Sequence, residues 1–170
     1  MSQAPHSRSQ AAATAAALMS YTTAEGRRQV LDALAAAADQ IGTAVAYLGE
    51  AYEQLDEYAA ERLEEQLFRP VQLAYGRARR VYSEFAGRHD LAARSFDAQH
   101  PHVRANDARG LIDSAVEAVA RADGGLGGLQ DSMLPIEVGD PQLRAGIEDV
   151  RMLLADVSDR AHRLERTLGR

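Results

Sequence analysis

The sequence predicts an all-α protein, an antiparallel four-helix bundle with coiled-coil-like seams, and two observations carry this prediction. The 170-residue chain is rich in alanine and all 19 of its basic residues are arginine, and both residue types favour helices. Apolar positions recur at alternating intervals of three and four residues, which places them on one stripe of a helix. A chain of this length, with 46% hydrophobic residues, can bury a core as a single domain.

Four stretches of the sequence carry such stripes. They cover residues 31–59, 67–85, 108–133 and 143–168, and the second is the shortest. A helix with one apolar stripe buries that stripe against its neighbours, so four stripes predict four helices that share one core.

The first helix is expected to begin at a capping box, in which Thr22 and Glu25 each satisfy a backbone N–H at the helix start. Residues 1–21 are then a flexible or frayed N-terminal segment, whose alanine-rich run resembles a secretory signal only faintly. Residues 22–170 form a single helical-bundle domain. Asn106 or Asp107 can cap the third helix.

The last two helices are separated by a turn within residues 134–140. Asp140 supplies a side-chain cap, and Pro141 follows it at the first helical position, where the missing N–H costs nothing. This helical hairpin is the part of the fold that the sequence predicts most clearly.

The first two helices are harder to separate, because residues 51–69 contain neither glycine nor proline. Ala59, Leu63 and Leu67 follow one another at steps of four, which shifts the stripe around the helix. Pro70 disfavours helical geometry before it and removes a backbone hydrogen bond. We therefore expect a long first helix that is kinked or broken near Pro70. Either the chain folds back there into a bundle, or it only kinks and two chains share the long helix.

Composition excludes several classes of function. The absence of cysteine excludes disulfides, thiolate zinc sites, iron–sulfur clusters and cysteine nucleophiles. The formal net charge of −6 argues against a nucleic-acid partner, which needs clustered cations. No stretch is apolar enough to span a membrane, and the common nucleotide, zinc, calcium and serine-hydrolase motifs are absent. We expect a cytoplasmic protein that needs no cofactor.

One pattern suggests a metal site. Asp159 and His162 are three residues apart, as are Asp97 and His100, and this spacing puts a carboxylate and an imidazole on one helical face. Di-iron bundles use Glu-x-x-His in this way, with further glutamates from other helices. Glutamates that share a predicted face of the first helix would complete such a site: Glu50, Glu53, Glu57, Glu61 and Glu64. A metal-binding or metal-dependent bundle is therefore the alternative hypothesis, with Asp159 and His162 as ligands.

Three other features are candidate contact surfaces for a protein partner. Tyr52 and Leu55 continue the seam of the first helix. Arg77 and Arg80 belong to a basic stretch that follows an acidic one, a pattern by which two helices or two chains select each other, although with Arg79 they could also hold an anionic surface. Four glycines surround Leu126 in the third stripe: Gly124, Gly125, Gly127 and Gly128. They indicate a hinge, a smooth surface for close approach, or a tolerated weakness.

The sequence therefore favours a non-enzymatic helical bundle that acts through protein–protein binding or self-association. The reason is that the apolar seams are longer than the helices of one chain can cover. A homodimer is the simplest assembly of this kind.

Overall fold

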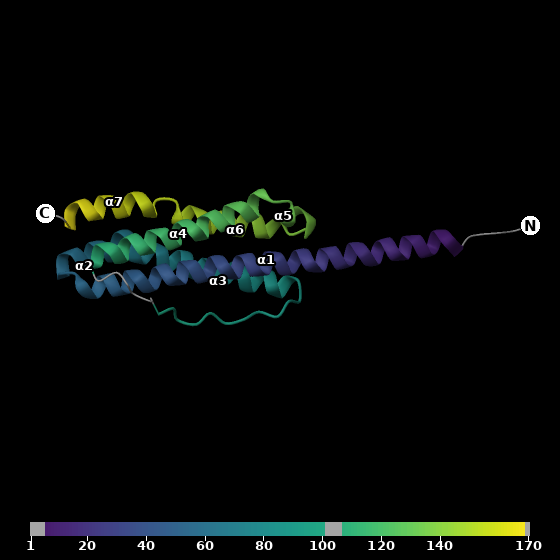
Figure 1. Ribbon diagram of the computed structural model, residues 1–170, viewed down its shortest axis with the longest axis horizontal. Coiled ribbons are helices and arrows are strands. Elements are labelled where there is room, and N and C mark those ends of the chain that lie inside the picture. Colours follow the sequence, from purple (N-terminus) through teal and green to yellow (C-terminus); the bar gives the residue numbers. More distant parts are fainter. Residues whose placement is uncertain (1–5, 101–106, 169–170) are drawn as a thin grey trace, which may run out of the picture.

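The computed structural model describes residues 6–100 and 107–168, and every element within these ranges is helical (Figure 1). The predicted all-α class is confirmed. The elements are α1 (His6–Gln54), α2 (Glu57–Leu63), the π-helical turn η1 (Glu64–Phe68), α3 (Arg69–Arg88), α4 (Ala108–Asp131), α5 (Leu134–Glu137), α6 (Pro141–Leu154) and α7 (Val157–Leu168).

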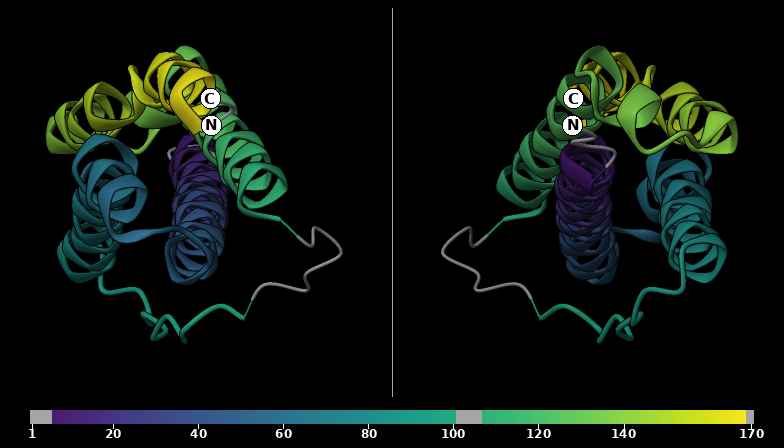
Figure 2. Two further views of the ribbon diagram at one scale, coloured as in Figure 1. Left: turned by 90° about the vertical axis from the view of Figure 1, so that its left-hand side faces the viewer. Right: turned by 90° about the vertical axis from the view of Figure 1, so that its right-hand side faces the viewer.

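The long helices pack side by side around a shared core. Figure 2 shows that α1 lies between α3 and α4, and that α6 and α7 lie together on one side of the layer that these three helices form. The chain runs in one direction along α1, α6 and α7 and in the other along α3 and α4 (Figure 1). Each helix therefore packs mainly against antiparallel neighbours.

The predicted stripes form the core. Fully or nearly fully buried positions occur on every long helix, among them Ile41, Phe85, Ile112 and Ile147. The exception is Met133, the last position of the third stripe, whose side chain is exposed because α4 ends two residues before it. Spacing alone therefore identified most of the side chains that hold the bundle together.

The chain reverses direction earlier than the sequence suggested. Helix α1 ends at Gln54, and α2 begins with Asp56 as its N-cap, whose carboxylate accepts a hydrogen bond of 2.9 Å from the Ala59 backbone N–H. Of the two alternatives at Pro70, the one in which the chain folds back there is therefore wrong. A side-chain cap at Asp56 makes the turn without glycine or proline.

Near Pro70 the helix continues through a wider turn. The five residues of η1 have π-helical geometry, and the Arg69 backbone N–H bonds to the Glu64 carbonyl, five residues back. Such a turn makes room for a proline ring that would clash in a regular helix. It also matches the four-residue steps of the sequence, because Leu63 and Leu67 are both fully buried.

Helix α1 also begins earlier than predicted, at His6 rather than at Thr22. The hydroxyl of Thr22 donates to the Met19 carbonyl at 2.9 Å, as threonines do inside a helix, so Thr22 does not cap its start. The N-terminal part of α1 projects beyond the bundle, and residues 10–19 are exposed (Figure 1). We call residues 6–22 the overhang.

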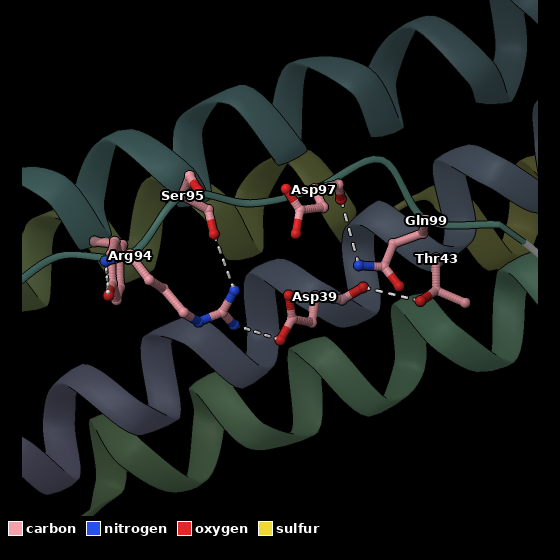
Figure 3. A network of polar contacts seen from close by, with 7 residues as sticks. Asp39, Thr43, Arg94, Ser95, Asp97 and Gln99 are labelled. Carbon is pink, nitrogen blue, oxygen red and sulfur yellow. Dashed lines mark hydrogen bonds and ion pairs between the residues drawn. The ribbon is translucent and has the colours of Figure 1, made fainter.

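The segment of residues 91–100, which follows α3, runs back along the bundle toward the end at which α4 begins (Figure 1). Arg94 fixes it to α1 through an ion pair of 2.5 Å with Asp39 (Figure 3), and its backbone N–H donates to the Tyr82 hydroxyl at 3.0 Å. The Phe96 ring meets Tyr82 edge to face at a centroid distance of 5.0 Å. Residues 101–106 lie outside the described ranges, and with them the proposed cap Asn106.

The two remaining predicted helix starts are confirmed. Asp107 caps α4 by accepting a hydrogen bond of 2.8 Å from the Gly110 backbone N–H, and Asp140 caps α6 by accepting one of 3.0 Å from Leu143. Asp140 is almost fully buried, and its other carboxylate oxygen accepts hydrogen bonds of 2.9 Å from both Arg88 and His89. It therefore joins the start of α6 to the end of α3.

Candidate interaction surface

A shallow groove runs between the outer faces of α3 and α6. It encloses about 740 Å³ and is lined by Gln72, Leu73, Gly76, Arg77, Arg80, Asp149, Met152 and Leu153. We call it the α3–α6 groove. Its apolar floor is exposed: the accessible fraction is 60% for Leu73, 67% for Met152 and 36% for Leu153.

These three side chains face outward because each helix already buries a complete stripe on its other side. Helix α3 buries Val71 and Ala74, and α6 buries Val150 and Leu154, so the apolar residues next to them are left outside the core. The groove extends toward α7, where a smaller hollow of about 260 Å³ shares the same three side chains and ends near Arg160. Contiguous exposed apolar surface of this kind marks interaction sites more often than isolated side chains do.

Leu73, Met152 and Leu153 were not among the predicted contact residues. They lie outside the single apolar stripe that was expected on each helix. The sequence does contain a sign of this surface, because these large apolar residues occupy positions at which an amphipathic helix normally carries polar side chains.

Charged side chains form the walls of the groove. Arg77 makes an ion pair with Asp149 across the two helices, and Arg80 donates to Glu84 at 2.8 Å. The hydrogen bond from Arg80 lowers the pKa of the Glu84 carboxyl, and the charges of Arg80, Arg77 and Arg88 lower it further. Each of these arginines is paired with a carboxylate, so the walls of the groove carry charges of both signs.

The other predicted contact residues lie elsewhere. Tyr52, in the last turn of α1, and Leu55, directly after that helix, are partly buried and pack against the core. Arg79, next to the groove residue Arg80, is positioned over the Tyr75 ring at 5.3 Å from its centroid. Of these predicted positions, only Arg77 and Arg80 line the groove.

The glycines of the third stripe do not interrupt α4, which continues through all of them. A Cβ atom at Gly127 would lie 3.2 Å from the Arg151 guanidinium, which crosses α4 there and bonds to Asp123 at 2.9 Å and Gln130 at 2.8 Å. Positions whose Cβ atoms would meet nothing within 4 Å are Gly124, Gly125 and Gly128. One glycine therefore admits a neighbouring side chain, and three face open space.

The proposed metal ligands Asp159 and His162 are exposed on α7, and the Nδ1 atom of His162 lies 2.7 Å from the Ser158 carbonyl oxygen. The expected acidic face was wrong, because the reversal at Asp56 separates Glu53 from Glu57 onto different helices. Within the described residues, no group of three or more histidine, aspartate or glutamate side chains is arranged to hold a metal ion.

One carboxyl pair lies close to His162. Glu165 on α7 is mostly buried, and this burial raises the pKa of its carboxyl group. A hydrogen bond with Asp113 and the charge of that residue raise it further, while Arg109, 4.0 Å away, and His162 lower it less. This pair joins α4 to α7 at a cost in electrostatic repulsion.

Comparisons of the chain with family models, with curated proteins and with solved structures found no match. No helix in the described part of the chain is long and apolar enough to cross a membrane. Functional inference therefore depends on the surfaces themselves, and the α3–α6 groove combines an exposed apolar floor with charged walls.

Proposed function

We propose that this protein is a non-enzymatic binding protein that holds a helix of a partner protein in the α3–α6 groove. The observation that carries the proposal is the exposure of Leu73, Met152 and Leu153 side by side in one groove. Exposing them is unfavourable in water, and covering them with apolar side chains recovers about 25 cal/mol per Å² of surface.

The shape of the groove and its apolar floor favour an amphipathic helix with polar flanks. From Glu65 to Arg80 the two hollows follow η1 and α3 for roughly 22 Å, at about 1.5 Å per residue, which is the length of about four helical turns. A partner helix with apolar residues at intervals of three and four would place them on the groove floor. Polar residues beside that stripe would meet Arg77, Arg80 and Asp149.

Affinity capture with a set of charge variants tests this proposal. Wild-type protein, Met152→Glu and Ala120→Glu are immobilised and exposed to a lysate of the source cells, and bound proteins are quantified by mass spectrometry. Ala120 is an exposed position of α4, so Ala120→Glu adds the same charge away from the groove. We expect a partner that wild type and Ala120→Glu retain and Met152→Glu loses. Equal capture by all three proteins contradicts binding at the groove.

We also propose that the protein self-associates, most simply as a homodimer, and that it resides in the cytoplasm. The projection of the overhang beyond the bundle supports self-association, because residues 10–19 of α1 are exposed there. The absence of cysteine is compatible with a reducing compartment. Light scattering during size-exclusion chromatography tests self-association, and a monomeric mass at high protein concentration contradicts it.

A further inference from the structure

The overhang is an unusual helix for an exposed position. No charged residue occurs from Ser9 to Ala24, and residues 11–17 are all alanine except Thr14. Leu18 and Met19 are more than 60% exposed. Helices that face water on all sides normally carry charges around their circumference, and a short helix without tertiary contacts has little stability of its own.

One face of the overhang continues a face that is covered inside the bundle. Ala12, Met19 and Gly26 are spaced by seven residues, so they lie close to one line along α1. Gly26 is buried against α5, where its Cβ atom would lie 3.5 Å from Leu134 and 3.6 Å from Val138. Beyond α5 the same line continues with Met19 and Ala12, which are exposed.

The base of the overhang has an apolar hollow. It encloses about 510 Å³ between α1 and α5 and is lined by Met19, Thr22, Thr23, Gly26, Glu137 and Val138. Ile136 of the same short helix is 60% exposed. We call this feature the α5 hollow.

We propose that the overhangs of two copies of this chain pair antiparallel about a two-fold axis, and that the tip of each overhang lies against the α5 hollow of the other copy. This inference rests on the self-association proposed above and specifies its surface. In such an isologous contact the same patch serves both chains, so an overhang and a hollow on one molecule are sufficient.

The length of the overhang fits this arrangement. Residues 6–22 span about 25 Å at roughly 1.5 Å per residue. When the pair is centred near Thr14, residue 6 of one chain lies level with residue 22 of the other, which borders the α5 hollow. The alanines at the centre let the two backbones approach closely.

Charge also favours pairing of two copies through their overhangs rather than through their bundles. Each chain carries a net charge of −6, so two bundles repel each other when they are packed together. Antiparallel overhangs place the bundles at opposite ends of the contact, and the contact itself contains no charge between Ser9 and Ala24. The pairing therefore separates the acidic parts of the two molecules.

Single cysteines test the register, because the chain has no cysteine of its own. In an antiparallel pair centred near Thr14, Ala12→Cys and Ala15→Cys each lie close to the same residue of the other copy. The Thr22→Cys residues are separated by about 24 Å, at roughly 1.5 Å per residue along the axis. We expect a short bismaleimide to cross-link the first two variants and not the third. Cross-linking of Thr22→Cys as efficiently as the others contradicts the antiparallel register.

Sedimentation equilibrium of charge variants tests the surface. Met19→Glu places a carboxylate in the contact twice per dimer, and we expect it to raise the dimer dissociation constant by at least about tenfold. Ala120→Glu is the matched control and should leave the constant unchanged. Neither residue belongs to the buried core, so circular dichroism melting should show an intact bundle for both.

The outcomes separate the two proposals. A monomeric wild type contradicts self-association and this inference together. A dimeric wild type whose dissociation constant is unaffected by Met19→Glu supports self-association and contradicts the overhang as its surface. Capture of a partner at the α3–α6 groove is independent of both results.

Discussion

Replacing Asp140 by alanine should destabilise the bundle more than removing any other helix cap of the described structure. One oxygen of Asp140 accepts the Leu143 backbone N–H at 3.0 Å, and the other accepts from Arg88 and His89 at 2.9 Å each. The Asp140 side chain is 5% exposed and that of His89 is 12% exposed. The substitution therefore removes a cap and also leaves the donors of Arg88 and His89 without their acceptor.

The magnitude follows from these contacts. Loss of an N-cap costs about 1 kcal/mol. Loss of a partner from a buried charged network costs about 3 kcal/mol or more, reduced here because the Arg88 side chain is 30% exposed and can reach water. We expect Asp140→Ala to lower the free energy of unfolding by about 3 kcal/mol in total. Asp107→Ala removes the exposed cap of α4 and should cost only about 1 kcal/mol.

Urea unfolding followed by circular dichroism measures both variants against wild type. The same experiment at low pH checks the electrostatic origin. Burial raises the pKa of the Asp140 carboxyl, but the hydrogen bonds from His89 and Arg88 and from the Leu143 backbone outweigh it, so the pKa lies below the ordinary value of 3.8. The ionised Asp140 carboxylate therefore contributes its full stabilisation above pH 3.8, and this contribution is lost as the pH falls through the lower folded-state pKa. The difference in the free energy of unfolding between wild type and Asp140→Ala should shrink in that pH range. If Asp140→Ala costs no more than Asp107→Ala at neutral pH, the reasoning about the buried network is wrong.

Two further predictions use the same unfolding assay. Glu165→Gln should raise the free energy of unfolding at pH 7, because the raised pKa of Glu165 beside Asp113 means that ionisation of its carboxyl group destabilises the fold as the pH rises. This gain in stability should disappear below pH 4.5. A loss of stability at pH 7 contradicts the prediction. Gly124→Ala should stabilise by up to about 1 kcal/mol, since its Cβ meets nothing within 4 Å. Gly146→Ala should instead destabilise, because its Cβ would lie 2.9 Å from a methyl group of the buried Val81, and a gain equal to that of Gly124→Ala would show that the two helices separate freely.

Periodicity predicted the fold class and the core because burial acts on every turn of a helix. Positions such as Ile41 and Ile147 were identified from spacing alone, and Asp140 with Pro141 gave the start of α6 correctly. The reversal of the chain was missed because Asp56 is a single polar residue in a strongly acidic stretch. Its role as a cap depends on where the helix turns, which is set by tertiary packing.

The candidate groove could not be found in the same way. Leu73 and Met152 are distant in sequence, and only the packing of α3 on α6 brings them together. Arg77 and Arg80 were predicted from their charge and do line the groove, whereas Tyr52 and Leu55 were predicted from the seam and pack against the core. An apolar seam predicts which residues are buried in the core, whereas a contact surface consists of residues that stay exposed outside it.

Hydroxyl-radical footprinting of methionines tests the central claim most directly, since exposed methionine is readily oxidised. Met152 is 67% exposed in the groove, and Met133, which is 60% exposed between α4 and α5, serves as a control within the same molecule. The protein is oxidised alone and in the lysate of its source cells, and both sites are quantified. We predict that Met152 becomes protected in the lysate while the reactivity of Met133 changes little. Equal protection of the two, or none at Met152, contradicts a partner helix in the α3–α6 groove.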